Sequence, residues 1–217
     1  VRALATRGRL LLAGGQHGLS IFRIRPDRTL RLLRTLCADE LGGGVAGLAV
    51  EAGRAWVLVP GSGAALGMDL MGGTFAVERR VALNAPGGKP LADAASVAKR
   101  GRHLVVGTGE RGSVVHYLLR SDGSSPATAE APLRTIDGAG GAYAGALARS
   151  GRRLLVAAGG GDVQALDLSP WLAGRYRQPA EVMDYFTVLG DVRAVAPAAR
   201  HLYAGTGELF GSATLIR

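Results

Sequence analysis

The sequence is poor in several residue types, and each shortage excludes a class of protein. A single cysteine, Cys37, in 217 residues excludes an internal disulfide framework and a cysteine-rich zinc site. No apolar run approaches the ~18 residues of a membrane-spanning helix, so we expect no membrane span. Aromatic residues are only 5% of the chain, which leaves few side chains on which nucleic-acid bases could stack.

Lysine is also scarce, and the net charge of +9 comes almost entirely from arginine. The arginines occur singly along the chain, often after a glycine, rather than in a basic block. A nucleic-acid-binding surface would gather them on one face with aromatic residues between them. We therefore expect a solvated basic surface and disfavour nucleic acid as a partner.

Glycine, in contrast, is abundant, with 34 residues or roughly twice the usual ~7%. Five segments share one pattern: a strand of small residues, a turn with arginine, an apolar strand, a glycine-rich loop and an alternating strand. The segments are Val1 to Ile24, Val45 to Leu70, Ala94 to Leu119, Tyr143 to Leu168 and Val192 to Arg217. Their turn arginines, spaced 45, 48, 50 and 48 residues apart, are Arg9, Arg54, Arg102, Arg152 and Arg200. Such regular spacing indicates internal repeats.

The repeats predict strands rather than helices, because their apolar runs are short and bounded by Gly, Pro, Asp and Ser. A fourth strand is expected between repeats, over Leu30 to Leu36, Phe75 to Leu83, Leu133 to Ile136 and Val182 to Leu189. Four antiparallel strands in ~40–50 residues are typical of a propeller blade. The predicted fold class is all-β: one β-propeller domain over residues 1–217, with repeats of approximately 1–44, 45–93, 94–142, 143–191 and 192–217. The alanine-rich first strands fit a narrow central channel.

On this evidence the chain resembles the β-propeller superfamily of WD40-like, quinoprotein-like and Kelch-like repeat proteins. The Trp-Asp dipeptide, the Kelch double glycine and the quinoprotein tryptophan motif are absent. The greatest similarity is to divergent bacterial propellers with blade segments such as Leu104 to Gly109 (LVVGTG). The resemblance covers the whole chain and implies an architecture without assigning an activity.

The strand count leaves the last blade incomplete, because only three strands are expected after residue 191. An open strand edge invites pairing with another chain. Three arrangements remain open: a five-bladed ring with a three-stranded last blade, part of a six-to-eight-bladed ring, or a ring completed by a partner. A 98-residue period, in which Arg102-His103-Leu104 returns as Arg200-His201-Leu202, favours an even blade number.

The loops between second and third strands and the connections between blades lie on one face, which is the usual binding surface of a propeller. They could form a polar rim around a pore, suited to a polar ligand or a peptide. The candidate ligand-binding residues are His17, Asp93, Glu110, Arg111, Asp162, Asp191 and Glu208.

The search for chemical motifs assigns no catalytic residue, metal or cofactor. Glu110 and Glu208 occupy matching repeat positions, so duplication explains the pair better than acid–base catalysis does. The histidines lack the spacing of zinc ligands, and we expect His103 and His201 to be edge or packing residues. Cys37 is expected to be a buried, unreactive thiol.

Two segments fall outside the repeat pattern. Ser121 to Pro132 is expected to be a loop insertion. Ser169 to Pro179 opens with Ser-Pro, which favours a short helix, and contains Trp171, Arg175 and Tyr176. These residue types dominate interface hot spots, so they are the candidate partner-binding residues. For Trp171 itself we favour the interpretation that it covers the rim of blade 4, and the segment remains the best candidate for contact with a partner.

Together these features favour a non-enzymatic scaffold that mediates protein–protein interaction or is a subunit of an assembly. A protein partner is expected, and another chain or a further segment would complete the open blade. The alternative is a ligand-binding or lactonase-like propeller enzyme that uses the pore-face loops. The lone cysteine slightly favours the cytoplasm, and the compartment stays open.

Overall fold

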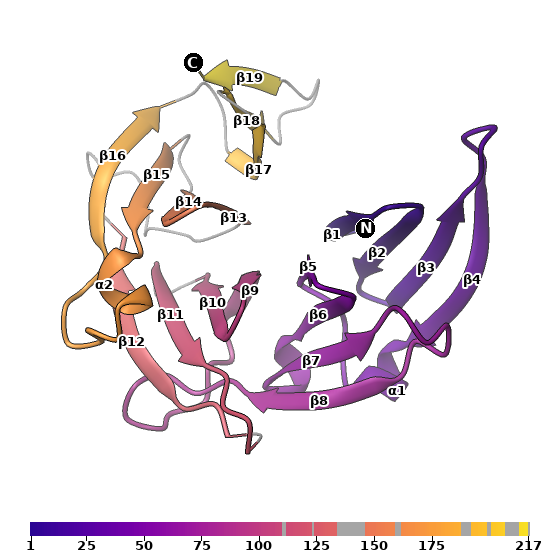
Figure 1. The fold of residues 1–217 in the computed structure, drawn as a ribbon, viewed down its shortest axis with the longest axis horizontal. Helices are drawn as coiled ribbons and strands as arrows, with labels where there is room; N and C mark the ends of the chain where they lie inside the picture. The colour runs from indigo at the N-terminus through magenta and orange to yellow at the C-terminus, as the bar shows by residue number, and fades with distance from the viewer. Residues whose placement is uncertain are drawn as a thin grey trace.

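The chain folds into five antiparallel sheets that follow one another in sequence and lie around a common centre (Figure 1). This computed structural model describes residues 1–217 except 110–111, 123, 134–145, 159–161, 188–191, 199–200, 207–212 and 217. Four sheets have four strands and the fifth has three. The predicted all-β propeller of five blades with an incomplete last blade is confirmed.

The strands of each blade run outward from the centre in sequence order. Blade 1 contains β1 (Ala3–Arg7), β2 (Leu10–Gly15), β3 (Gly18–Ile24) and β4 (Leu30–Cys37), followed by α1 (Ala38–Leu41). Blade 2 contains β5 (Gly47–Glu51), β6 (Arg54–Val59), η1 (Pro60–Ser62), β7 (Ala64–Asp69) and β8 (Val77–Ala82). Blade 3 contains β9 (Ala94–Arg100), β10 (His103–Thr108), β11 (Ser113–Leu118) and β12 (Ala127–Pro132). Blade 4 contains β13 (Ala146–Ser150), β14 (Arg153–Ala157), β15 (Asp162–Asp167), α2 (Ser169–Leu172) and β16 (Glu181–Thr187); blade 5 contains β17 (Val192–Ala198), β18 (His201–Thr206) and β19 (Ala213–Ile216).

Two predictions outside the regular pattern have different outcomes. The fourth strand of blade 3 is β12, within the segment predicted to be a loop insertion, so that prediction was wrong. The misleading signal was the Pro- and Ser-rich composition, which describes residues 121–126 but not the alternating strand after them. The predicted short helix after Asp167 is confirmed as α2, with Pro170 in its first turn.

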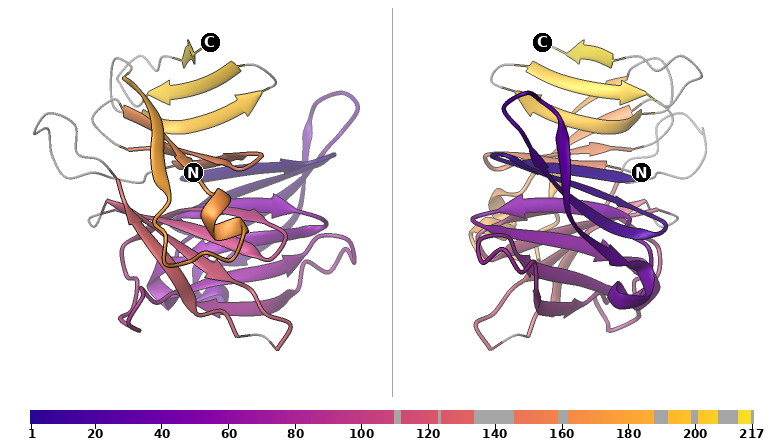
Figure 2. Two further views of the ribbon diagram at one scale, coloured as in Figure 1. Left: turned by 60° about the vertical axis from the view of Figure 1, so that its left-hand side comes forward. Right: turned by 90° about the vertical axis from the view of Figure 1, so that its right-hand side faces the viewer.

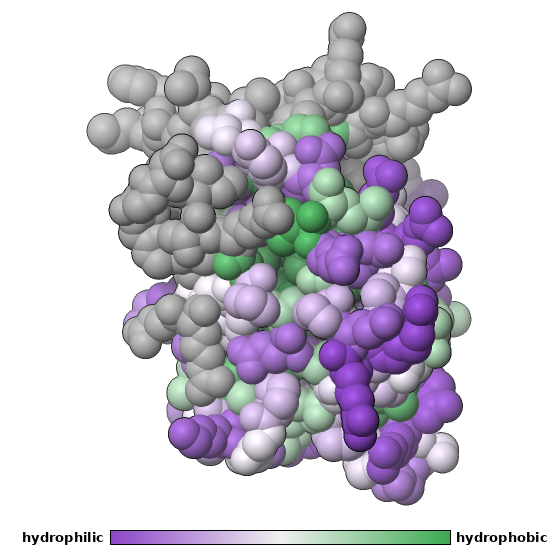
Figure 3. Space-filling model, turned by 90° about the vertical axis from the view of Figure 1, so that its left-hand side faces the viewer, coloured by the Kyte–Doolittle hydropathy of each residue, from purple (hydrophilic) through white to green (hydrophobic). Residues whose placement is uncertain are grey.

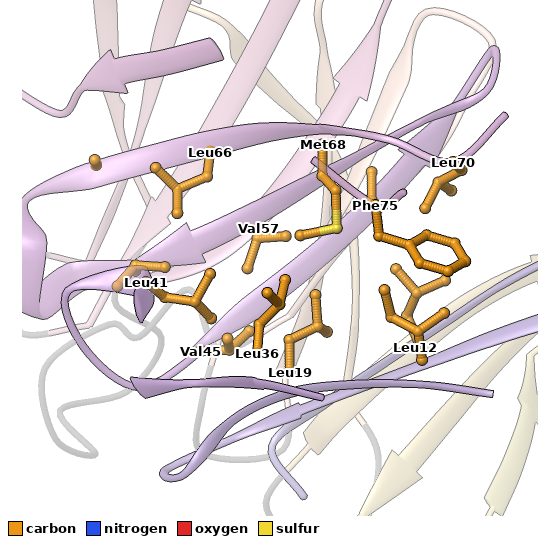
Figure 4. Packing of buried hydrophobic residues seen from close by; sticks show 14 residues of the cluster. Leu12, Leu19, Leu36, Leu41, Val45, Val57, Leu66, Met68, Leu70 and Phe75 are labelled. Atoms are coloured by element: carbon orange, nitrogen blue, oxygen red, sulfur yellow. The ribbon is translucent and has the colours of Figure 1, made fainter. Parts of the chain in front are cut away.

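Neighbouring blades are held together by apolar side chains that meet between their sheets (Figure 4). Between blades 1 and 2, Leu12, Leu19 and Leu36 face Val57 and Met68. All five are at most 5% exposed. Because side chains alternate along a strand, blades 2 to 4 each pack one face of their sheet on the next blade and the other face on the preceding blade.

The first strands of all five blades meet at the centre, where they line a channel of about 180 Å³. Small residues are required there by the close approach of the strands. A Cβ on Gly47 would lie 3.2 Å from the backbone nitrogen of Val97 in the first strand of the next blade. The close approach at the axis thus explains why the first strands are rich in alanine and why Gly47 has no side chain.

The five blades form an arc with an opening between blade 5 and blade 1 (Figures 1 and 2). Each of the first four blades packs on the blade that follows it, and strand β17 of blade 5 packs on β13. Across the opening, blade 1 presents exposed leucines, of which Leu4 is 63% exposed. In the part of the chain that the structure describes, no helix has the length and hydropathy needed to cross a membrane.

Candidate functional site

The packing of the described blades leaves uncovered the face of blade 1 that borders the opening. Strand register places Thr6, Leu11, Phe22 and Leu32 side by side in one row across its four strands. A second row contains Leu4, Ala13, Ser20 and Thr35, and a third pair is Ile24 with Leu30. None of these ten residues is charged. We call this set the open face of blade 1.

The exposure of the open face contrasts with that of the opposite face of the same sheet. Leu30 and Leu32 are 51% and 53% exposed, whereas Leu36 on the same strand is 5% exposed and packs on blade 2. Leu32 and Leu36 lie on opposite faces of β4 because the strand contains a β-bulge between them. The bulge is seen as a shift in strand register opposite Ile21 and Phe22. The open face therefore has the composition of a blade interface without a neighbouring blade.

The other side of the opening is formed by blade 5. Tyr203 on β18 is 44% exposed and pairs with Ala196 on β17, which is also exposed. On its other face this blade packs on blade 4 through Val192, Leu202 and Ala204. The opening is thus bordered by apolar side chains from two blades.

The candidate ligand-binding residues of the pore face are only partly within the described structure. Glu110, Arg111, Asp191 and Glu208 lie outside the described residues.

The other three pore-face candidates come from separate blades. His17 is exposed at the turn between β2 and β3, and Asp93 is half-buried before β9. Asp162 opens β15 and accepts a hydrogen bond of 3.0 Å from the hydroxyl of Thr187. Ligand binding by these seven residues stays a prediction.

The channel itself carries little chemistry in its described lining, which is mostly alanine, valine and leucine with the cationic Arg2 and Arg193. No group of three or more His, Cys, Asp or Glu that could hold a metal ion occurs among the described residues.

Cys37 is exposed, so the expectation of a buried thiol was wrong. It pairs with Gly18 at the end of the open face, where a neighbouring blade would be needed to bury it.

The segment with the candidate partner-binding residues packs against blade 3. Trp171 is fully buried and its Nε1 donates a hydrogen bond of 2.9 Å to the carbonyl of Gln178. This burial is what the favoured interpretation expects, in which Trp171 covers the rim of blade 4, and the indole offers no surface to a partner. Arg175 is exposed and Tyr176 half-buried, and their contact with a partner stays a prediction.

Two histidines of blade 3 pack beneath this segment. The rings of Trp171 and Tyr176 lie 5.3 and 5.4 Å from the ring of His116. Nδ1 of His103 lies 2.9 Å from Nε2 of His116. The hydroxyl of Thr128 donates to the carbonyl of His116 and contacts its Nδ1. The expectation that His103 is a packing residue is confirmed, and the side chain of His201 lies outside the described residues.

The surroundings of both imidazoles disfavour their charged form. Burial, followed by the nearby His103 and Arg149, lowers the pKa of His116 from 6.5 to about 3. Burial also lowers the pKa of His103. Protonation would place a charge on a side chain that is 1% exposed, so this group stabilises the packing between blades 3 and 4 in its neutral form.

Sequence reasoning missed the open face of blade 1. The strand pattern places apolar residues on both faces of every blade, and this signal does not say which blade lacks a neighbour.

On the side of the molecule that carries blades 3 and 4, hydrophilic side chains make up much of the described surface (Figure 3).

Comparison with known proteins identifies the fold and no family. No family model matches the chain, and no curated protein matches it. The computationally designed Ika8 protein is 13% identical, with a TM-score of 0.60 over 98% of this chain and 56% of that chain. A chain of the Mitotic Checkpoint Complex is 15% identical, with a TM-score of 0.59 over 92% and 55%. BamB from Moraxella catarrhalis is 17% identical, with a TM-score of 0.53 over 93% and 56%.

At these identities the similarity shows the β-propeller fold alone. The chain spans a little over half the length of each of these three propeller proteins.

Proposed function

We propose that this protein is a non-enzymatic β-propeller scaffold and that it binds a partner protein through the open face of blade 1. The observation that carries the proposal is an uncharged, half-exposed sheet face in a chain whose net charge is +9. Exposed apolar patches bordered by polar residues mark interaction sites. We further propose that residues 1–217 act as one domain.

The partner we propose is a β-sheet with an apolar face, which packs on blade 1 as a further blade would. Blade 2 supplies the template, because its matching face packs on blade 1 through Val57, Leu66 and Met68, which are at most 2% exposed. Two sheets with alternating apolar faces pack about 10 Å apart with interdigitated side chains. Support by analogy comes from the Mitotic Checkpoint Complex, in which a chain with this fold is part of a complex.

Cys37 provides a direct test, since it is the only cysteine and lies exposed at the end of the open face. The tagged chain is purified from its native cells, and recovered proteins are identified and weighed intact. For each complex, the rate at which a thiol reagent modifies Cys37 is compared with that of the free chain. We expect a stoichiometric partner that protects Cys37 and is lost in a Leu4→Arg/Leu32→Arg variant.

The matched control is Met71→Arg, which adds a charge at a residue that is 74% exposed in the turn after β7, away from the open face. This variant should retain the partner. Equal recovery of a partner by the two variants would exclude the open face as the binding surface. Recovery of the repeats in one longer chain whose own sheets protect Cys37 would assign the face to intramolecular packing and overturn the proposal.

A further inference from the structure

A pocket of about 550 Å³ lies between blades 2 and 3, on the side of the ring that carries the turns between first and second strands. The basic residues that line it are Arg54, Arg79, Lys99, Arg102 and Arg120. Glu51 is the one carboxylate among its described lining residues. This pocket is separate from the open face and from the pore face, and the proposed scaffold function does not use it.

Backbone carbonyls hold two of the guanidinium groups in place. Nη2 of Arg79 donates to the carbonyl of Arg120 at 2.5 Å, and Nε of Arg102 donates to the carbonyl of Leu119 at 3.1 Å. Among the described residues, no carboxylate lies within 4 Å of either group; Arg54, in contrast, pairs with Glu78 at 2.6 Å. A carbonyl positions a guanidinium without neutralising it, so the charges of Arg79 and Arg102 remain uncompensated.

The pocket also contains a buried donor without a partner and a buried, paired cation. Nε of Arg79 is buried and has no hydrogen-bond partner among the residues that the structure describes. The side chain of Lys99 is 5% exposed, and its Nζ lies 3.2 Å from Glu51, donates to the carbonyl of Gly101 and lies 5.4 Å from the ring centre of Trp56. Burial is the largest cause of a lowered pKa for Lys99. A buried cationic donor without a partner is costly, and an anion in the pocket would remove that cost.

We propose that this pocket binds a small, multiply charged oxyanion whose phosphoryl or carboxylate oxygens accept hydrogen bonds from Arg79 and Arg102. The planar guanidinium presents paired donors that match the oxygens of both groups. With about 550 Å³, the pocket has room for a ligand larger than a single phosphate ion.

Titration calorimetry at low salt with inorganic tripolyphosphate and with citrate tests the proposal. We expect saturable binding of one ion per chain, and the tighter of the two probes identifies phosphoryl or carboxylate chemistry. Arg79→Gln should weaken binding about tenfold or more, because it removes a charge-assisted hydrogen bond. Arg31→Gln, at an exposed residue of β4, loses the same charge outside the pocket and should leave binding unchanged.

A gain of affinity separates ligand binding from damage to the fold. Glu51→Gln removes the negative charge from the pocket, while the amide oxygen can still accept the hydrogen bond that the Gly101 nitrogen donates at 2.8 Å. This variant should bind the probe several-fold more tightly, an outcome that misfolding does not produce. Absence of saturable binding, or equal weakening by Arg79→Gln and Arg31→Gln, would overturn the proposal.

Discussion

The opening between blades 5 and 1 can be tested with two leucines of one strand. Leu32 and Leu36 lie on opposite faces of β4, and they are 53% and 5% exposed. Leu36 packs among Leu12, Leu19 and Met68 in the interface of blades 1 and 2. Leu32 has the neighbouring Phe22 beside it in its own sheet and solvent in front of it.

The expected costs of truncation to alanine follow from these exposures. Leu36→Ala removes a buried side chain and leaves a cavity, which costs about 2–5 kcal/mol. Full burial of a leucine contributes about 1.5–3 kcal/mol, and Leu32 obtains roughly half of it, so Leu32→Ala should cost about 1 kcal/mol. No cavity term is added, because Leu32 is 53% exposed and packs on no further blade among the described residues.

Urea unfolding of the monomer, followed by tryptophan fluorescence, measures both costs. The two tryptophans are good probes because Trp56 and Trp171 are 3% and 0% exposed and lie in blades 2 and 4. The slope of free energy against urea should stay unchanged, so that the midpoint reports stability. Equal costs for the two variants would show that the open face is covered within the monomer, and would refute the open arc.

Three further predictions concern the packing of individual residues. The pKa of His116 is about 3 in the folded state and 6.5 ordinarily, so the unfolded state binds the proton first as the pH falls. The free energy of unfolding should therefore fall by up to ~1.4 kcal/mol per pH unit between these two values. Urea unfolding at each pH should show a less steep fall for His116→Gln. Gly18→Ala should lower the free energy of unfolding by about 2 kcal/mol or more in the same assay. The reason is that φ of Gly18 is +121° and the added Cβ would lie 2.1 Å from the carbonyl oxygen of Leu36. An unchanged urea midpoint would contradict this close approach. Trp171→Ala should lower the free energy of unfolding by about 3–5 kcal/mol, because the indole is fully buried. Arg175→Ala, at an exposed site, should lower it by less than ~0.5 kcal/mol. Similar thermal midpoints for the two variants would show that the indole is not buried.

Predictions from local sequence were wrong for β12 and for Cys37. The Pro- and Ser-rich stretch 121–126 hid the start of β12, whose alternation of small residues is weak. Cys37 ends an apolar strand and was expected to be buried, yet its burial depends on a sheet that the opening lacks. The basic pocket was also missed, because Arg79 and Arg102 are 23 residues apart and meet only when blades 2 and 3 pack.

The sequence by itself determined the repeat, the strand order within each blade and the presence of five repeats with an incomplete last one. These depend on alternation, turn residues and spacing, which are properties of neighbouring residues along the chain. Only the tertiary structure decided that the five blades leave an opening, which face of blade 1 is exposed and which arginines share a pocket. Those features depend on contacts between sheets that are about 50 residues apart in sequence, and every blade carries two apolar faces whether or not a neighbour covers them.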